Sequence, residues 1–374
     1  MTPAQFLEFL VSVSIQSAIV VGVTHWLCQI VASPRLQCRL WNLCHVLILV
    51  LVVCGMALPH FRVLNPWQAL PPIVIEQVVA TETMLGQAAL GIWLAGTSLS
   101  LILLIREWRR AFRFLNSCRI ANAAETLLVT PSPESDHETL DQPVQLLMSN
   151  HLGSPFCCQW HHPLLVIPEF MLDMRPEEIQ YVARHELEHL RSGHPLQLFV
   201  QRVVATVFWF HPVVWWASRQ SSLAREFACD DAAVTAQRDV VAYLKVLVAI
   251  AERGRTQEAE GAALFFSRGA GILALRGRRL LNRLESNSWS PTISERLWWP
   301  QTVLVLLTLA AWCFWTPLDA LASTRTRWSP WPRWSASFLH TLEISARDFE
   351  PYDTRTRLHE MSERSAHSES QRAE

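Results

Sequence analysis

Charged residues are scarce in this chain: only 17% of its 374 residues are Asp, Glu, Lys or Arg, and Lys245 is the only lysine. The formal net charge is −1. The chain therefore lacks the bulk positive charge with which many proteins bind nucleic-acid phosphates, and we expect no direct nucleic-acid partner. Half of the residues are apolar and the mean hydropathy is +0.16. This composition excludes an intrinsically disordered chain and favours a membrane protein.

The nine cysteines lack the spacing of a known framework. They form no C-x-x-C motif, which a redox site or a thiolate zinc site would need, and several lie within apolar runs. The adjacent pair Cys157 and Cys158 and the isolated Cys229 are no exception. We therefore interpret all nine as ordinary reduced cysteines, and we do not expect the disulfide scaffold of a small secreted domain.

Long uncharged stretches are what the sequence does contain. About 20 apolar residues are needed for a helix to cross a bilayer. Four stretches rich in Leu, Val, Ile and Ala have no Asp, Glu, Lys or Arg over 22 residues or more: 9–34, 40–61, 83–105 and 297–318. The sequence therefore predicts a membrane α-helical fold with four spans. Three of them lie in a membrane region at 1–105, and the fourth lies within 297–322.

The arginines predict the orientation of these spans, because loops on the cytoplasmic side carry an excess of basic residues. Arg35 and Arg39 lie between the first two spans, and Arg106, Arg109, Arg110 and Arg113 follow the third. We expect a protein of the inner, cytoplasmic membrane with its N-terminus outside. Residues 106–296 then form a cytoplasmic domain. The polar, Ser-rich segment 323–374 is expected to be a disordered external tail.

The predicted cytoplasmic domain mixes strands and helices. Short apolar runs at Thr126–Val129, Val144–Met148 and Leu164–Ile167 predict strands, and Pro131–Gln142 reads as an exposed loop. We expect Leu164–Ile167 to be an edge strand that pairs with an extended substrate. A helix is predicted to start at Arg175–Glu178, where proline and acidic residues favour a first turn, and to end near Gly193.

That helix carries the sequence His185-Glu186-Leu187-Glu188-His189. Two imidazoles four residues apart project from one face and can bind one zinc ion, and Glu186 is then placed to accept a proton from a water that the metal activates. The five-residue pattern is short enough to arise on an ordinary surface helix. A third ligand is therefore needed to decide.

Two residues are candidates for that ligand. His194 follows His189 by five residues, which is not the spacing of a metzincin third histidine. Glu226 and Asp230 lie four apart on a later helical stretch, so Glu226 can bind the metal while Asp230 accepts a hydrogen bond from a ligand histidine. The alternative is that both acids are solvated beside Arg225.

Between the two motifs lies the uncharged stretch 203–218, which contains Pro212. At 1.5 Å per residue it spans about 24 Å, too short for a bilayer. A full crossing would also place Glu226 on the opposite side from His185. We therefore predict a membrane-associated hairpin. His211 in this stretch is either structural or an oxyanion stabiliser.

Taken together, these motifs resemble the membrane metallopeptidase family M56, which includes the BlaR and MecR signal transducers. The resemblance rests on Ser154-Pro155-Phe156, Pro163–Pro168, Pro176-Glu177-Glu178, Arg184–His189, Phe210-His211-Pro212 and Arg225–Asp231. It implies a gluzincin-like domain with one Zn²⁺ per chain, held by His185, His189 and Glu226, and with Glu186 as general base. It also implies cleavage of a cytoplasmic regulator, such as a transcriptional repressor, or of the transducer itself after an external signal.

The sequence departs from those receptors in one respect. They carry a penicillin-binding sensor domain that is acylated at Ser-x-x-Lys, and Ala242 lies three residues before the only lysine of this chain. We therefore expect no β-lactam sensing by that mechanism. Two other functions stay open: a quality-control membrane protease of the HtpX type, and a receptor or scaffold without proteolytic activity. The presence of Glu186 argues against the latter, because a structural zinc site needs no general base.

Overall fold

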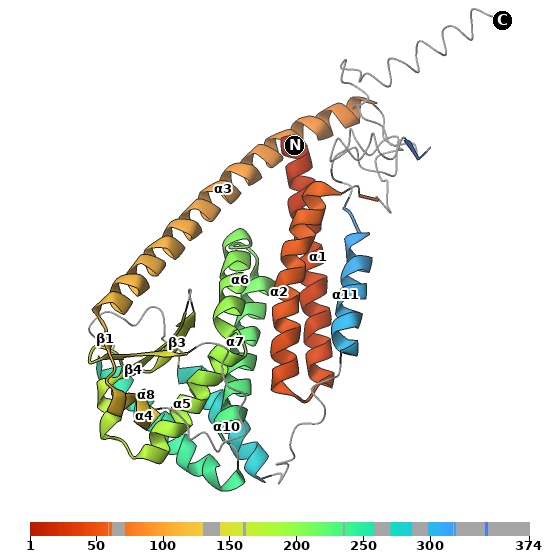
Figure 1. Ribbon diagram of the computed structural model, residues 1–374. Coiled ribbons are helices and arrows are strands. Elements are labelled where there is room, and N and C mark those ends of the chain that lie inside the picture. The colour runs from red at the N-terminus through yellow and green to blue at the C-terminus, as the bar shows by residue number, and fades with distance from the viewer. Residues whose placement is uncertain are drawn as a thin grey trace, which may run out of the picture. The chain divides into compact units, whose positions relative to one another are not determined.

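The computed structural model describes residues 1–58, 60–61, 72–129, 143–159, 162–234, 236–257, 270–285, 298–316, 318 and 341–342. The predicted loop at 131–142 and nearly all of the predicted tail lie outside these residues. The chain divides into two compact units (Figure 1). The helical unit comprises Met1–Trp26, Cys44–Ser98 and Trp299–Glu374, and the sheet unit comprises Leu27–Leu43 and Leu99–Trp298.

Within the described residues, three helices are long and apolar enough to cross a membrane, as the sequence predicts: α1 (Pro3–Ile30), α2 (Pro34–Ala57) and α3 (Pro72–Ser117). The fourth predicted span contains α11 (Trp299–Trp312), which has 14 residues. At 1.5 Å per residue α11 is about 21 Å long, shorter than the roughly 30 Å of hydrocarbon. A fourth complete span therefore stays a prediction, as does the orientation of all spans.

Polar side chains of α1 bind the chain at the end of α11 within the helical unit. Glu8, Ser12 and Gln16 are buried and spaced four residues apart, so they share one face of α1. Trp315 Nε1 donates to Glu8 Oε1 at 2.6 Å, and the backbone nitrogen of Thr316 donates to Ser12 Oγ at 3.0 Å. Gln16 Nε2 donates to backbone carbonyls of the same segment. The bonds from Gln16 satisfy the carbonyls of Trp312 and Phe314, at and just beyond the end of α11, where helical partners are missing.

The sheet unit contains a four-stranded sheet: β1 (Arg119–Ile120), β2 (Gln145–Ser149), β3 (Phe156–Gln159) and β4 (Pro163–Pro168). The strand order is β1-β2-β4-β3, with β2 parallel to β4 and the other pairs antiparallel. The strands predicted at Val144–Met148 and Leu164–Ile167 are present. The prediction that Leu164–Ile167 is an edge strand is wrong, because β3 folds back and pairs with its outer side. Its unbroken apolar run, buried on both faces, is typical of a central strand.

Alternate residues of β2 and β4 point to opposite faces of the sheet and build two cores. One face packs on α5 (Pro176–Arg191) and α8 (Val240–Gln257), and the other packs on the end of α3. The buried members of the first core are Val129, Leu146, Met148, Leu165, Ile167, Met171, Ile179, Val182, Ala183, Val246 and Ile250. Those of the second are Leu147, Leu152, Phe156 and Val166, which Phe114 and Leu115 partly cover.

The strand predicted at Thr126–Val129 is instead the end of helix α4 (Ala123–Val129). Asn122 and Glu125 cap this helix reciprocally: Glu125 N donates to Asn122 Oδ1, and Asn122 N donates to Glu125 Oε2, both at 2.8 Å. This capping box satisfies the first free amides of the helix and outweighs the β preference of the apolar residues after it.

Helix α5 starts and ends where the sequence predicts. Arg175 occupies the N-cap position, Pro176 is the first residue of the helix, and the carboxylate of Glu178 accepts from the Arg175 backbone nitrogen at 3.1 Å. It ends before Gly193, whose φ of +64° lies in the left-handed region. The chain reverses there and continues as α6 (His194–Val207). The remaining elements are α7 (Pro212–Ala233), α10 (Ala270–Glu285) and the short 3₁₀ helices η2 (Glu169–Asp173) and η3 (Gln237–Asp239).

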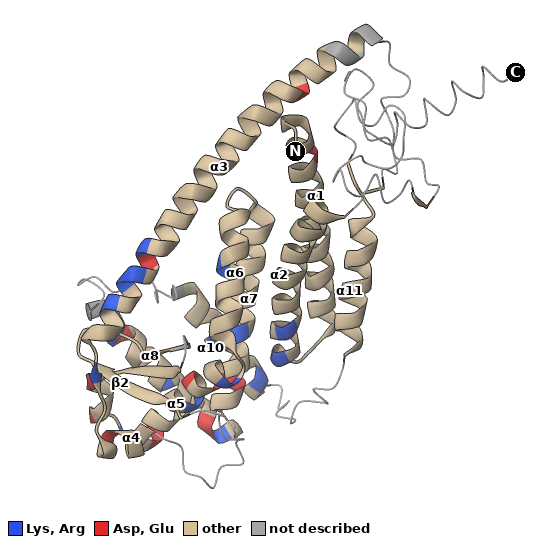
Figure 2. Cartoon of the chain, turned by 45° about the horizontal axis from the view of Figure 1, so that its top comes forward, with Lys and Arg blue, Asp and Glu red and all other residues tan. Residues whose placement is uncertain are grey.

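Helices α6 and α7 lie side by side as an antiparallel hairpin whose tip is the stretch 208–211 (Figure 1). Gln201 of α6 crosslinks the pair: its Nε2 donates to the Ser218 carbonyl at 3.1 Å, and its Oε1 accepts from Arg225 Nη2 at 2.8 Å. Charged side chains are sparse near the tip and along most of α1, α2, α3 and α11 (Figure 2).

Gly193 offers a test of the turn between α5 and α6. A non-glycine residue in the left-handed region costs about 1–2 kcal/mol, although a Cβ here would meet nothing within 4 Å. We expect Gly193→Ala to lower the midpoint of thermal unfolding, and Gly193→Asn to lower it less. Gly271→Ala, in helix α10 with equally open surroundings, is the control and should cause no loss. Equal midpoints for Gly193→Ala and the wild type would show that this turn is not under strain.

Candidate metal centre

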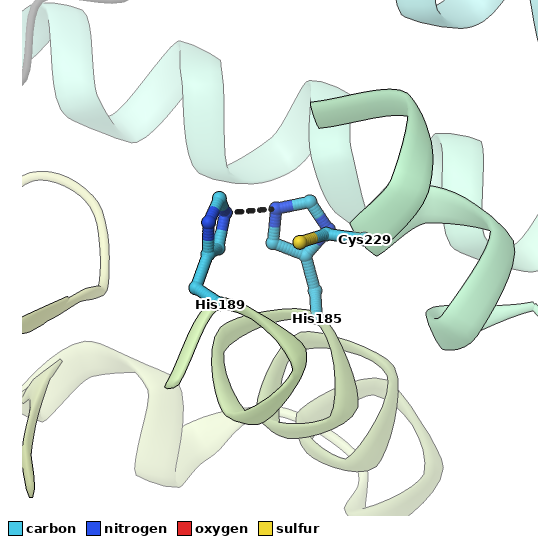
Figure 3. A group of neighbouring side chains, drawn as sticks. All are labelled: His185, His189 and Cys229. Atoms are coloured by element: carbon cyan, nitrogen blue, oxygen red, sulfur yellow. Dashed lines mark hydrogen bonds between the residues drawn. The ribbon is translucent and has the colours of Figure 1, made fainter. Parts of the chain in front are cut away.

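Helix α5 places His185 and His189 one turn apart on a buried face, each with 4% of its surface exposed. Their Nε2 atoms face each other at 3.3 Å, and their rings meet edge to face (Figure 3). Ile179, Val182 and Ala183 anchor the preceding turns of α5 in the core against the sheet. The helix is therefore fixed in rotation, and its histidine face points to α7.

Helix α7 packs on α5 and brings Glu226 to the two imidazoles. Glu226 Oε2 lies 3.5 Å from His185 Nε2, and Oε1 lies 3.6 Å from His189 Nε2. The carboxylate is 3% exposed. Three residues that the sequence predicted as ligands, separated by up to 41 positions, thus meet at one point in the sheet unit.

The spacing of these atoms fits a tetrahedral metal ion. With metal–ligand bonds of about 2.0–2.1 Å, neighbouring ligand atoms of a tetrahedron lie about 3.3–3.4 Å apart. The two Nε2 atoms are 3.3 Å apart, which is close to that edge length, and each has a different oxygen of Glu226 nearby, at 3.5 and 3.6 Å. Imidazole nitrogen and carboxylate oxygen are also ligand types that zinc accepts. The residues present therefore fit the ion that the sequence motif implies.

Cys229 is a further donor that sequence reasoning missed. Ligand atoms of His185, His189 and Cys229 all lie within 4.8 Å of one another (Figure 3). Cys229 follows Glu226 by three residues, so both lie on the face of α7 that packs on α5. Burial raises the pKa of its thiol well above the ordinary value, and the charge of Glu226 adds to this effect. Our interpretation of Cys229 as an ordinary cysteine overlooked this position.

Behind His185 lies a buried polar network of Asp230, Tyr243 and Arg276. Tyr243 of α8 donates its hydroxyl hydrogen to Asp230 Oδ1 at 2.7 Å and also lies 3.0 Å from His185 Nδ1. Because its single hydrogen goes to the carboxylate, the tyrosine oxygen must accept from His185 Nδ1–H. Asp230 Oδ1 itself is 3.3 Å from Nδ1. This assignment leaves the lone pair of His185 on Nε2, which faces the centre.

Arg276 of α10 joins the two carboxylates of α7. It donates to Asp230 at 2.5 and 2.9 Å, and its Nη1 lies 3.0 Å from Glu226 Oε2. Burial alone would raise the pKa of Asp230, but the adjacent Arg276 guanidinium and the bond with His185 lower it below the usual value. Asp230 is thus held ionised, and one oxygen of Glu226 is fixed.

No local pattern distinguishes Tyr243 or Arg276 before folding. Arg276 belongs to a run of arginines in which Arg279 and Arg283 pair with Asp231 instead, at 2.7 and 2.5 Å. The run indicates a basic helix but not which member turns inward. Only the packing of α10 on α7 and α8 makes that choice.

The remaining predicted residues lie in different places. Glu186 is buried on α5, with 3% of its surface exposed. His211 is the residue before α7 at the hairpin tip, where its ring contacts Phe208 and Phe210. Since α7 is continuous, about 21 Å of helix separates His211 from Glu226. This geometry does not support the oxyanion role, and His211 is best explained as a structural residue of the hairpin.

Apolar helices long enough to cross a membrane, together with a buried cluster of two histidines and an acid on packed helices, are typical of membrane metallopeptidases. Comparison of the sequence with known families agrees: the family described as BlaR1 peptidase M56 matches residues 8–266, and the chain belongs to this family. It is therefore a membrane-associated protease.

One curated relative is "Regulatory protein BlaR1" of Bacillus licheniformis, 24% identical over 156 residues. That match covers 42% of this chain, and it spans only about a quarter (26%) of the relative's length. The family match includes all the predicted site residues. Arg276 lies ten residues beyond its end.

The network makes Arg276 a test of how the centre is held together. Arg276→Met removes the cation that two buried carboxylates share, and breaking a buried ion pair on one side costs about 3–5 kcal/mol. We expect a large drop in the thermal midpoint of metal-stripped protein. Arg278→Met, an exposed position on the same helix, should have little effect. Equal midpoints for the two variants would show that Arg276 does not stabilise the site.

Proposed function

We propose that this protein is a zinc endopeptidase of the cytoplasmic membrane, in which His185, His189 and Glu226 bind one Zn²⁺ per chain. The observation that supports this most directly is that two Nε2 atoms 3.3 Å apart meet the two oxygens of one buried carboxylate, at 3.5 and 3.6 Å. Membership of a peptidase family supports the reaction class. Glu226 is preferred over Cys229 because its two oxygens reach both imidazoles and because Arg276 fixes its orientation.

When bound, zinc would supply a Lewis acid that polarises the scissile carbonyl and makes water a stronger nucleophile near neutral pH. The residues of the chain supply the rest. Glu186, one residue after His185 on α5, accepts the proton of the attacking water and passes it to the leaving amine. Asp230 and Tyr243 keep the lone pair of His185 on Nε2, and Arg276 keeps Glu226 from rotating away.

The substrate is proposed to bind as an extended peptide along β3. Within the part of the chain that the structure describes, no strand pairs with the outer side of β3. This strand also lies beside α5, which carries the metal motif. Main-chain hydrogen bonds to such an edge would present a peptide bond to the centre without requiring a particular side chain. We therefore propose β3, rather than Leu164–Ile167 of β4, as the strand that pairs with the substrate.

We place the centre on the cytoplasmic side, at the inner leaflet. The arginines after the third span support the orientation. The α6–α7 hairpin supports the proximity to lipid, because Leu196 and Phe199 are 67% and 54% exposed and Trp215 and Trp216 are also exposed. Large apolar side chains in that position fit contact with the lipid bilayer.

The biological role that we favour is signalling: cleavage of a cytoplasmic regulator, such as a transcriptional repressor, or of the chain itself in response to an external signal. The Bacillus licheniformis relative is described as a regulatory protein, and this supports the choice. Quality control of membrane proteins is the alternative role, and a receptor without proteolytic activity is the alternative class. The number and identity of the proteins whose cleavage depends on Glu186 distinguish these alternatives from signalling.

Glu186→Gln tests the proposal. The amide keeps the size of the side chain but cannot accept a proton, so we expect about one zinc per chain and a loss of proteolysis by several orders of magnitude. Zinc content is measured in detergent-purified protein, and substrates by comparing the proteomes of cells that carry each form. Glu177→Gln, exposed on the same helix, is the matched control and should behave as wild type.

The outcomes separate the roles. One specific substrate that accumulates with Glu186→Gln supports signalling, and many substrates support quality control. Turnover near that of the wild type with Glu186→Gln would contradict the assigned base and point to another carboxylate such as Glu188. No zinc in the wild-type protein would overturn the metal centre itself.

A further inference from the structure

His194, rejected as a third ligand because of its spacing, lies against the other side of His189. Its Nδ1 is 2.9 Å from His189 Nδ1, and the two rings meet edge to face with centroids 4.9 Å apart. His194 is 4% exposed. The left-handed turn at Gly193 makes this contact, since it folds the first residue of α6 back onto the last turn of α5.

The hydrogen-bond partners of His194 fix the positions of the protons. Gln197 Nε2 donates to the Ser192 carbonyl at 2.9 Å, so its Oε1 faces Cys38, whose thiol donates to it at 3.2 Å. The Cys38 sulfur, 3.5 Å from His194 Nε2, has its hydrogen committed and therefore accepts from Nε2–H.

The remaining proton positions can then be assigned for neutral rings. With its hydrogen on Nε2, His194 has its lone pair on Nδ1, where it accepts from His189 Nδ1–H. Cys229 Sγ, 3.6 Å away, is a weak donor to the same nitrogen. His189 is thereby left with its lone pair on Nε2, the atom that faces His185 and Glu226. A metal-binding histidine needs this tautomer.

Cys38 comes from the first turns of α2, far from His194 in sequence but in the same unit. The segment Leu27–Leu43 belongs to the sheet unit, where the Arg35 guanidinium lies 3.4 Å from the Glu188 carboxylate and the Trp41 ring contacts Trp216. The start of an apolar, membrane-spanning helix thus takes part in the hydrogen bonds that orient a residue of the metal centre.

We propose that His194 is a positioning residue for His189: it fixes the tautomer and the ring orientation of this ligand, and it connects the ligand to Cys38 of α2. The two histidines of the centre are then held by different means, His185 by a carboxylate and a tyrosine, and His189 by a second imidazole that reaches a transmembrane helix. The inference rests on the proposed zinc site.

The test measures Zn²⁺ affinity by chelator competition and the visible spectrum of Co²⁺-substituted protein. His194→Leu removes the acceptor, and loss of such an outer partner costs about 10–100-fold in metal affinity. We expect that loss together with a shifted Co²⁺ spectrum. His194→Asn, whose side-chain oxygen can take the place of Nδ1, should restore most of the affinity, whereas His194→Gln places its polar atoms nearer the Nε2 position and should not.

Two cysteine variants, one as the test and one as its control, examine the connection between His194 and α2. Cys38→Ala removes the acceptor for His194 Nε2–H and should weaken Zn²⁺ binding in the same direction but less than His194→Leu. Cys44→Ala, a buried cysteine of the same helix that belongs to the helical unit, should bind as the wild type does.

Affinity and spectrum equal to wild type in His194→Leu, or rescue by Gln rather than Asn, would overturn the positioning role. If His194→Leu fails to fold, the Zn²⁺ affinities of His194→Asn and His194→Gln are compared instead, and the higher affinity of His194→Asn is the expected result. Equal affinities for Cys38→Ala and the wild type would overturn the connection to α2. Absence of zinc from the wild-type protein would instead mean that the proposed metal site has failed, so the two failures are distinguishable.

Discussion

The packing of α5 against α7 determines the chemistry of this molecule, because it buries more negative than positive charge in one place. The carboxylates of Glu186, Glu226 and Asp230 are all at most 3% exposed, and Arg276 is the cation that contacts two of them, Glu226 and Asp230. Formally the negative charges exceed this positive charge by two. Buried charges are stable only when they are paired or bind a metal. A divalent cation between the imidazoles would neutralise the excess, so metal binding and the stability of the helix pair depend on the same contacts.

The rest of the sheet unit holds that helix pair in place. The sheet anchors one side of α5 through Ile179, Val182 and Ala183, while α8 and α10 contribute Tyr243 and Arg276 to the network behind His185. The outer partners of the two histidines therefore come from three different elements, α7, α8 and α6, and Arg276 of α10 holds the α7 partner Asp230. Displacement of any one of them would move a hydrogen bond to the centre, which is how a distant part of the chain can affect a metal site.

Features that depend on local rules could be predicted from the sequence. His185, Glu186 and His189 share a turn of one helix, and proline, acids and Gly193 mark its limits, so the motif and its boundaries were predictable. Val144–Met148 and Leu164–Ile167 were recognised as strands by their apolar runs. Thr126–Val129 belongs to a helix although its apolar residues indicate a strand, because the capping pair Asn122 and Glu125 starts a helix just before it.

Features that depend on contacts between distant segments could not be predicted. An apolar run does not reveal which neighbour it pairs with, so the place of β4 within the sheet required β3 to be seen. Tyr243, Arg276 and Cys38 resemble many other residues of their helices until folding turns them toward Asp230 or His194. Sequence spacing argued against His194 as a ligand, but it could not show that this residue lies against His189 from behind.

The central claim is that two imidazoles and the Glu226 carboxylate, rather than the Cys229 thiolate, bind the metal. X-ray absorption spectroscopy at the zinc edge of the detergent-purified protein tests it most directly. We predict a first shell of nitrogen and oxygen atoms only, at about 2.0–2.1 Å, with the outer scattering of two imidazoles. A sulfur atom at about 2.3 Å would contradict the account, because it would make Cys229 the third ligand and leave Glu226 to Arg276 alone.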